Sequence, residues 1–190
     1  GNDYLKGGKG DDILIGGDGN DSIDAGLGSN RIFGDAGDDT ITSSGSDNVD
    51  AGEGNNTIVI SGTATGGTYT SGYGNDSFTV KTGATGNYTI TSAGGNNSFD
   101  IQTDVNANIT INASNASNAV NSVNALSGIH RFDSSNSDDD SGNGDDTLSL
   151  VNVTGLVTTG DGDDTIVATG LIGNNNTYEW KTGFGHVGLR

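Results

Sequence analysis

A nine-residue repeat at the start of the chain limits its possible folds more than any other feature of the sequence. The repeat has the form Gly-Gly-x-Gly-x-Asp-x-(apolar)-x, and its clearest copies are GGKGDDILI at residues 7–15 and GGDGNDSID at residues 16–24. Two further copies, AGLGSNRIF and GDAGDDTIT, follow without a gap at residues 25–33 and 34–42. Because Gly and Asn accept positive φ at low steric cost, each copy predicts a tight turn followed by one short strand.

The apolar residue of each copy marks one predicted strand. Two units make a coil of about 18 residues, which cannot bury its own apolar face and must stack on its neighbours. We therefore expect an all-β fold, a parallel β-roll or β-helix solenoid with about 18–21 residues per coil and one loop insertion. The apolar markers are Leu5, Leu14, Ile23, Ile32, Ile41, Val49, Ile58, Tyr69, Phe78, Ile90, Phe99 and Ile109.

The charge of the chain comes almost entirely from Asp. The formal net charge is −18, with 25 acidic and 7 basic residues, and Glu occurs only at Glu53 and Glu179. Scattered Lys and Arg residues form no basic stripe, so we expect no nucleic-acid partner. No apolar run approaches the roughly 20 residues that cross a bilayer, so we expect no membrane insertion. The chain contains no Cys, which excludes disulfides and thiolate metal sites.

The position of Asp in the repeat predicts a calcium site. Turns that each present one carboxylate, stacked about 4.8 Å apart on the same side, would repel one another without a cation. Calcium takes six to eight oxygen ligands, and tight turns expose backbone carbonyls that can complete such a shell. Zinc prefers His or Cys and magnesium demands stricter geometry, so the donor set favours calcium.

These tandem units resemble the RTX (repeats-in-toxin) family, whose parallel β-roll binds calcium between successive turns on each side. The resemblance implies that sixth-position carboxylates bridge neighbouring turns, namely Asp3, Asp12, Asp21, Asp39, Asp47, Asp76, Asp146 and Asp164. It also implies that backbone carbonyls complete the shell, at Gly8, Gly10, Gly17, Gly19, Gly26, Gly28, Gly37, Gly144 and Gly162. The fifth-position residues are expected to lie outside the ligand shell or to face solvent, at Asp11, Asp38, Asp145 and Asp163.

Some turns depart from the repeat. The sixth position is an amide at Asn30, Asn56 and Asn97, and an amide oxygen brings no charge, so these sites are expected to be weak or absent. Asp47 lies in a unit that is one residue short, which makes it a poorer ligand candidate than Asp39. We expect about five to eight Ca²⁺ ions in all.

The repeat divides the chain into five segments. We predict a calcium-rich RTX β-roll at residues 1–60, a continued solenoid with degenerate Asn- and Thr-rich turns at 61–112, and an inserted loop at 113–143. The loop can include a short helix around Val120, Val123 and Leu126. RTX coils are expected to resume at 144–170, and the aromatic stretch at 171–190 is predicted to cap the solenoid.

The resemblance also implies a cellular setting. Extracellular modules hold calcium at about 10⁻⁴ to 10⁻³ M, so we expect a secreted or cell-surface protein of a Gram-negative bacterium that leaves by type I secretion and folds outside. We expect a structural or adhesive role, with host or neighbouring cell-surface glycans or proteins as candidate partners. We expect no enzyme activity, because a catalytic carboxylate pair occurs once in an enzyme, whereas these carboxylates recur at every turn. Two alternatives stay open: the non-catalytic C-terminal secretion and folding module of a type I secreted enzyme or toxin, and a surface-layer protein.

Overall fold

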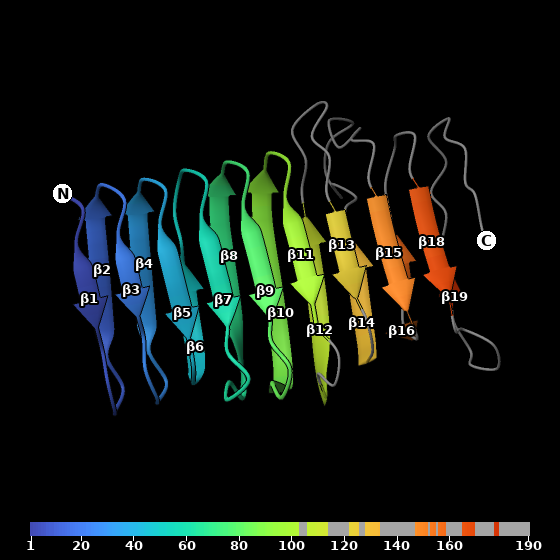
Figure 1. Ribbon diagram of the computed structural model, residues 1–190, viewed down its shortest axis with the longest axis horizontal. Coiled ribbons are helices and arrows are strands. Elements are labelled where there is room, and N and C mark those ends of the chain that lie inside the picture. The colour runs from blue at the N-terminus through green and yellow to red at the C-terminus, as the bar shows by residue number, and fades with distance from the viewer. Residues whose placement is uncertain are drawn as a thin grey trace.

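The chain folds into a solenoid of stacked β-coils (Figure 1). The computed structural model describes residues 1–102 and 106–113, together with the backbone of residues 122–125, 128–133, 147–151, 153–154, 156–158, 165–169 and 177–178. Every regular element in these ranges is a strand, and the strands pair in parallel along the whole array. The predicted all-β parallel solenoid is therefore confirmed.

The strands form two parallel sheets on opposite sides of a narrow interior. The first sheet contains β1 (Tyr4–Lys6), β3 (Ser22–Asp24), β5 (Thr40–Ser43), β7 (Thr57–Ile60), β9 (Ser77–Val80), β11 (Ser98–Ile101), β13 (Ser122–Ala125), β15 (Thr147–Val151) and β18 (Thr165–Thr169). The second contains β2 (Ile13–Asp18), β4 (Arg31–Ala36), β6 (Ser46–Asp50), β8 (Gly66–Tyr73), β10 (Thr85–Gly94), β12 (Asn106–Ala113), β14 (Gly128–Asp133), β17 (Leu156–Thr158) and β19 (Thr177–Tyr178). A short strand, β16 (Val153–Thr154), also pairs with β14.

The turns between strands lie on two edges of the solenoid. The turns that join β2, β4, β6, β8 and β10 to the next strand lie at the top of Figure 1, and we call them the upper edge. The turns that follow β1, β3, β5, β7 and β9 lie at the bottom and form the lower edge. Turn residues in contact on one edge are 17 or 18 positions apart in the first coils and 20 or 21 further on, so the coil lengthens as predicted.

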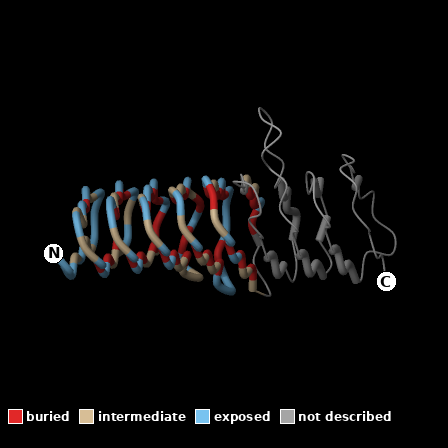
Figure 2. The backbone as a smooth tube through the Cα atoms, turned by 90° about the horizontal axis from the view of Figure 1, so that it is seen from above, coloured by how far each residue is buried: buried red, intermediate tan, exposed pale blue. Residues whose placement is uncertain are grey.

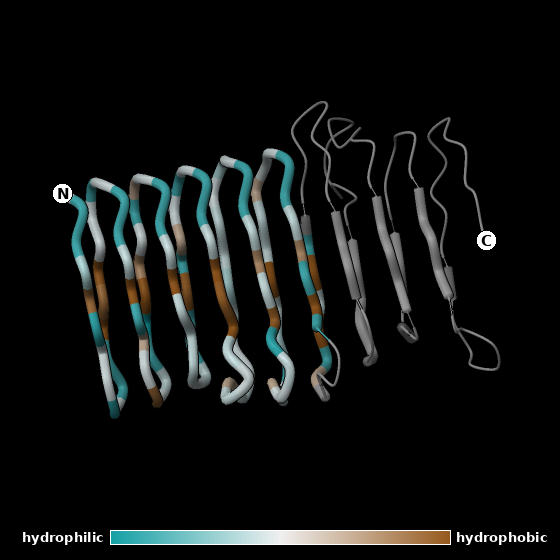
Figure 3. The backbone as a smooth tube through the Cα atoms, in the orientation of Figure 1, coloured by the Kyte–Doolittle hydropathy of each residue, from teal (hydrophilic) through white to brown (hydrophobic). Residues whose placement is uncertain are grey.

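A ladder of apolar side chains fills the interior. The side chains recur once per strand at the predicted markers, most of them less than 2% exposed, while Leu14 is 9% exposed and Leu5 packs against the core from a partly buried position. The exception is β12, where Ile111 takes the marker position in register with Ile90, and the predicted Ile109 is instead in register with Tyr88. Figure 2 shows buried positions recurring coil after coil, and Figure 3 shows apolar residues at mid-strand with hydrophilic residues at the upper turns. From the fourth coil onward the interior gains a second row, which includes Ile60, Val80 and Ile101.

The range 113–143, for which a loop is expected, contains two strands. β13 pairs with β11 and β15, and β14 pairs with β12, so the solenoid continues through part of this range. Ser122–Ala125 is a strand, and the expected short helix around Val123 is therefore wrong. Val123 takes the register position of Phe99, but the flanking Ala, Ser and Asn residues lack the glycine turns that reveal such a strand in sequence.

Within the described ranges, no helix is long and apolar enough to cross a membrane.

Candidate metal centre

The sixth-position side chains of the upper edge form a continuous hydrogen-bonded ladder. The backbone N–H of Asp3 donates to Asp21 Oδ1 at 2.6 Å, and the N–H of Asp21 donates to Asp39 Oδ1 at 2.8 Å. The same bond then repeats at 2.9 to 3.0 Å with the side-chain oxygens of Asn56, Asp76 and Asn97 as acceptors. One oxygen of each of these side chains is therefore used by the backbone of the preceding coil.

The lower edge begins with the same ladder but soon loses it. The N–H of Asp12 donates to Asn30 Oδ1 at 2.9 Å, and the N–H of Asn30 donates to Asp47 Oδ1 at 3.0 Å. The next residue in register is Gly67, which has no side chain, and the one after it is Tyr88. The polar ladder of the lower edge therefore ends at Asp47.

Within the described coils, three carboxylates have a second oxygen that is buried and has no hydrogen-bond partner. These atoms are the Oδ2 of Asp12, Asp21 and Asp39. Asp21 is 3% exposed and Asp39 is 1% exposed, so water does not solvate them as it would a surface carboxylate. Burying an ionised oxygen without a partner is strongly unfavourable, and such a group is normally paired or bound to a metal.

Glycine at the first turn position leaves the space beside these oxygens open. A β-carbon at Gly7 would lie 2.8 Å from Asp12 Oδ2. A β-carbon at Gly16 would overlap Asp21 Oδ2, and one at Gly34 would overlap Asp39 Oδ2. Each of these three Oδ2 atoms, which we call the orphan oxygens, therefore faces a position without a side chain. The same positions lie close to backbone carbonyl oxygens of the next coil, at Ala25, Gly34 and Ala51.

The electrostatics of the upper edge favour a bound cation. Burial raises the pKa of Asp39, and the carboxylates of Asp21, Asp35 and Asp38 raise it further, against the opposing effect of the Asp21 N–H. Burial also raises the pKa of Asp76, while the hydroxyls of Ser71 and Ser92 lower it. The ionised form of Asp39 is thus disfavoured by desolvation and by like charge, and a divalent cation would relieve both.

Asp47 and Asp76 differ from the three orphan carboxylates. The hydroxyl of Ser43 donates to Asp47 Oδ2 at 2.6 Å, and the amide of Asn30 donates to Asp47 Oδ1 at 2.9 Å. Both oxygens of Asp47 therefore have protein partners. At Asp76 the hydroxyl of Ser92 lies 3.4 Å from Oδ2, which is a long hydrogen bond.

A second ladder runs along the upper edge at the fifth turn position, and the sequence analysis missed it. Asn20 N–H donates to Asn2 Oδ1 at 2.9 Å, and Asp38 N–H donates to Asn20 Oδ1 at 3.0 Å. The pattern continues to Asn55, Asn75 and Asn96. These side chains bond to the following coil, whereas sixth-position side chains bond to the preceding one. The signal in the sequence is that every one of these positions holds Asn or Asp.

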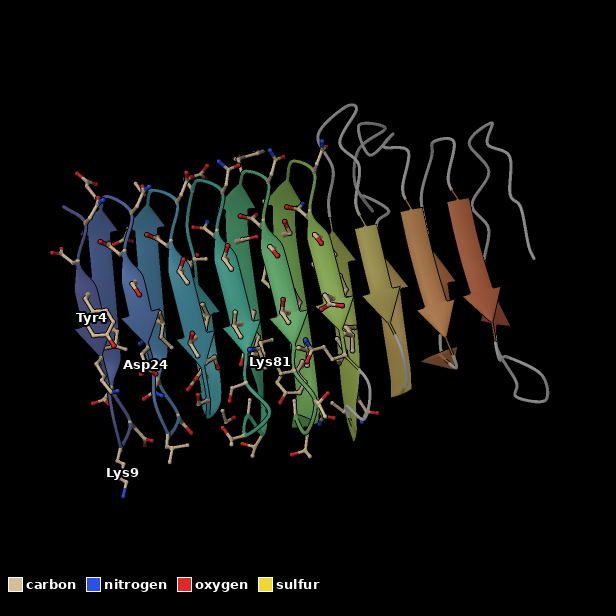
Figure 4. The ribbon with its side chains drawn as sticks, in the orientation of Figure 1. Tyr4, Lys9, Asp24 and Lys81 are labelled. Carbon is tan, nitrogen blue, oxygen red and sulfur yellow. The ribbon has the colours of Figure 1, made fainter. Side chains whose placement is uncertain are left out.

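The predicted carbonyl ligands of the first coils lie in the same turns, at Gly8, Gly10, Gly17, Gly19, Gly26, Gly28 and Gly37. The carbonyls of Gly8 and Gly28 also accept the N–H groups of Leu27 and Ser46, at 2.7 and 2.9 Å. Third-position side chains point outward, as Lys9 does at the lower edge in Figure 4. The predicted sites at Asp146, Asp164, Gly144 and Gly162, with Asp145 and Asp163, lie outside the described residues.

Comparison with known protein families supports the interpretation of these turns as calcium-binding repeats. Residues 1–32 and 24–58 match the family described as RTX calcium-binding nonapeptide repeat (4 copies). This part of the chain consists of RTX calcium-binding repeats. No curated protein and no solved structure matches the chain.

The RTX repeats fit calcium on the evidence of the turns themselves. The orphan oxygens are hard anionic donors, and calcium accepts both carboxylates and backbone carbonyls. Among the residues that the structure describes, no three acidic or His side chains converge on one point, so backbone carbonyls would have to complete any calcium shell. The chain thus carries a calcium-binding repeat segment in a β-solenoid.

Proposed function

We propose that this chain is a structural, calcium-folded segment of a secreted or cell-surface bacterial protein, with calcium held at the turns of Asp12, Asp21 and Asp39. The observation that carries the proposal is the set of three buried Oδ2 atoms without partners in these turns. Asp3 and Asp76 remain candidate ligands of the same ladder. Asp47 is not proposed as a ligand, because Ser43 and Asn30 satisfy its oxygens.

Calcium at these turns would supply the positive charge that the stacked carboxylates of the upper edge lack. The only ion pair within the part of the chain that the structure describes joins Lys6 Nζ to Asp24 Oδ2 at 3.2 Å, and Lys6 is exposed. Among the described upper turns, no Lys or Arg side chain therefore forms an ion pair with the stacked carboxylates. Because the unfolded chain has no preformed site, the free energy of calcium binding contributes to folding.

The role of the segment is to form a rod that exists only where calcium is abundant. Its folded form is a stack of coils in which each coil depends on its neighbours, so one unfilled turn weakens the coils on both sides. The same property would let the chain leave the cell unfolded and fold outside. The two parallel sheets give the solenoid two extended outer faces, and these faces support the proposed structural or adhesive role.

Circular dichroism of the chain during calcium titration tests this proposal. After removal of metal by a chelator we expect the β-sheet signal to be lost, and added calcium should restore it with a midpoint of about 10⁻⁴ to 10⁻³ M. Magnesium at the same concentration should not restore it, since it tolerates irregular oxygen shells poorly. A β-sheet spectrum that survives the chelator would contradict calcium-dependent folding, and a midpoint far below micromolar would contradict the extracellular setting.

A further inference from the structure

We infer that the residues at the first and sixth turn positions together determine which turns bind calcium and which do not. We call these calcium turns and metal-free turns, and in the metal-free turns a hydrogen-bond donor of the protein takes the place of the ion. The inference rests on the proposed calcium function and specifies where along the solenoid it operates. Calcium turns combine Gly with Asp, at Gly7 and Asp12, Gly16 and Asp21, and Gly34 and Asp39. Metal-free turns combine Ala or Ser with Asn, or Ser43 with Asp47. The turn of Ser71 and Asp76 stands between the two classes, because the Ser92 hydroxyl lies 3.4 Å from Asp76 Oδ2 and bonds to it only weakly.

Asn56 shows how an amide can replace the ion. Its Oδ1 accepts the N–H of Asp39, as an Asp would in the same ladder. Its Nδ2 donates to the carbonyls of Gly52 at 3.1 Å and Gly54 at 3.3 Å, within its own turn. An amide therefore presents a donor to turn carbonyls at the place where an aspartate presents a second acceptor.

Asn97 repeats this arrangement two coils further along the upper edge. Its Oδ1 accepts the N–H of Asp76 at 2.9 Å. Its Nδ2 donates to the carbonyls of Gly94 and Gly95 at 3.3 and 3.1 Å. Asn56 and Asn97 are each 1% exposed, so the two amides act in the same buried setting as Asp39.

The lower edge uses a hydroxyl for the same purpose. Ser43 donates to Asp47 Oδ2, and the phenol of Tyr69 lies 2.7 Å from the Ser43 hydroxyl. Since Ser43 uses its proton on the carboxylate, Tyr69 donates to Ser43. Tyr69, Ser43 and Asp47 are all 1% exposed or less, and together with the Asn30 amide they form a closed network around one carboxylate.

The first position changes together with the sixth. The register pairs Gly16 and Gly34 with Ala51, Ser71 and Ser92 along the upper edge. A β-carbon at Gly34 would overlap both Asp39 Oδ2 and the Ala51 carbonyl, so a calcium turn requires Gly there. Ala51 carries that β-carbon in the turn whose sixth residue is Asn56. The side chain at the first position thus occupies space that the calcium turns leave open.

Counting bound calcium in the full chain tests this assignment. Asp39→Asn should lower the number of ions by about one while the chain stays folded, because the amide supplies the missing donor. Ala51→Gly combined with Asn56→Asp should raise the number by about one, because it recreates the Gly and Asp pair. The count is measured by isothermal titration calorimetry and by elemental analysis of desalted protein, with circular dichroism at each calcium concentration.

Matched controls lie one residue away in each turn. Asp38→Asn and Asn55→Asp make the same charge changes at exposed fifth positions, and should leave the calcium count unchanged. Asn56→Asp alone should leave a buried carboxylate beside the Ala51 methyl, so it should destabilise the fold without adding a tightly bound ion.

The outcomes separate this inference from the calcium function itself. Wild-type chain that binds no calcium would contradict the proposed function. Wild-type chain that binds calcium, with counts that Asp39→Asn and the double variant do not change, would overturn the sorting of turns alone. An Asp39→Asn chain that fails to fold would also overturn it, because the amide is expected to replace the ion.

Discussion

The upper and lower edges begin with the same repeat, but further along the chain they fill their turns with different types of side chain. At the sixth position the upper edge keeps polar side chains, in the order Asp21, Asp39, Asn56, Asp76 and Asn97. The lower edge changes in register from carboxylate and amide to glycine, aromatic and aliphatic residues, in the order Asp12, Asn30, Asp47, Gly67, Tyr88 and Ile109. Its first position changes in parallel, from Ser43 to Ile60, Val80 and Ile101.

Under the proposed function, this difference means that ions stabilise some turns of the solenoid and protein side chains stabilise others. Where the lower edge has no carboxylate, the coil is longer and Ile60, Val80 and Ala84 bury apolar area inside it. Burying a large aliphatic side chain stabilises a fold by about 1.5 to 3 kcal/mol. The short coils of the first repeats lack this second row, and under the proposed function calcium at the turns of Asp12, Asp21 and Asp39 would stabilise them instead.

Removing one ligand of the upper edge is expected to change the calcium dependence of folding more than any other substitution considered. Asp21→Ala deletes the orphan Oδ2 and the acceptor for the Asp3 N–H. We expect the calcium concentration for half-maximal folding to rise by at least about tenfold, equivalent to about 1.4 kcal/mol. Asn20→Ala removes only an exposed fifth-position acceptor, and should shift the midpoint far less in the same circular dichroism titration. Equal shifts for the two variants would show that calcium does not use Asp21.

A substitution at a stacked glycine tests the backbone that positions the ligands. Gly37 has φ of +141°, and a β-carbon there would overlap the carbonyl oxygen of Gly19 in the preceding coil. Gly37→Ala should therefore lower the free energy of unfolding by about 1 to 3 kcal/mol in saturating calcium. Thr63→Ala at an exposed lower turn serves as the control in urea unfolding. A Gly37→Ala chain as stable as the control would contradict the close stacking of upper turns.

A pair of tyrosines tests the network that replaces calcium on the lower edge. Tyr69→Phe removes the phenol that bonds to Ser43, and should cost about 1 to 2 kcal/mol with no change in the number of bound ions. Tyr88→Phe is the matched control, because no side chain forms a hydrogen bond with the buried hydroxyl of Tyr88. The control should be neutral or slightly stabilising in thermal unfolding. A fall in the calcium count for Tyr69→Phe would mean that the network supports an ion after all.

The smallest expected effect is a dependence of stability on alkaline pH. Burial raises the pKa of Tyr69 above its ordinary value of about 10, and the charges of Asp47 and Tyr88 add to the shift. The stability that follows is fully present below about pH 10 and is lost as pH rises toward the folded-state pKa. Between about pH 10 and 12 the free energy of unfolding in urea should therefore fall less steeply in Tyr69→Phe than in the wild type. No difference between the two would argue that Tyr69 does not resist ionisation.

The repeat made the fold and part of the site predictable. A period of eight to twelve residues is enough to identify Ile23, Ile41 and Phe78 as core residues, because each strand needs only one inward apolar side chain. The sixth-position carboxylates were found in the same way. Their calcium occupancy and that of the predicted carbonyls stay predictions.

The pairing of residues across coils was not predictable from the repeat. The bond between Ser43 and Tyr69 joins residues 26 positions apart and depends on how far a phenol reaches past Gly67. The fifth-position ladder depends on backbone N–H groups of the next coil, which a pattern of side chains does not display. The importance of the first position emerges only when Asp39 Oδ2 is seen next to Gly34.

A crystal structure of the chain grown in calcium, with anomalous difference density at a wavelength suited to calcium, tests the central claim most directly. We expect calcium beside Asp12, Asp21 and Asp39 and none within the turns of Asn56 and Asn97, whose amides bond to their own carbonyls. Calcium of equal occupancy in the Asn56 and Asn97 turns, or none beside Asp21 and Asp39, would contradict the account.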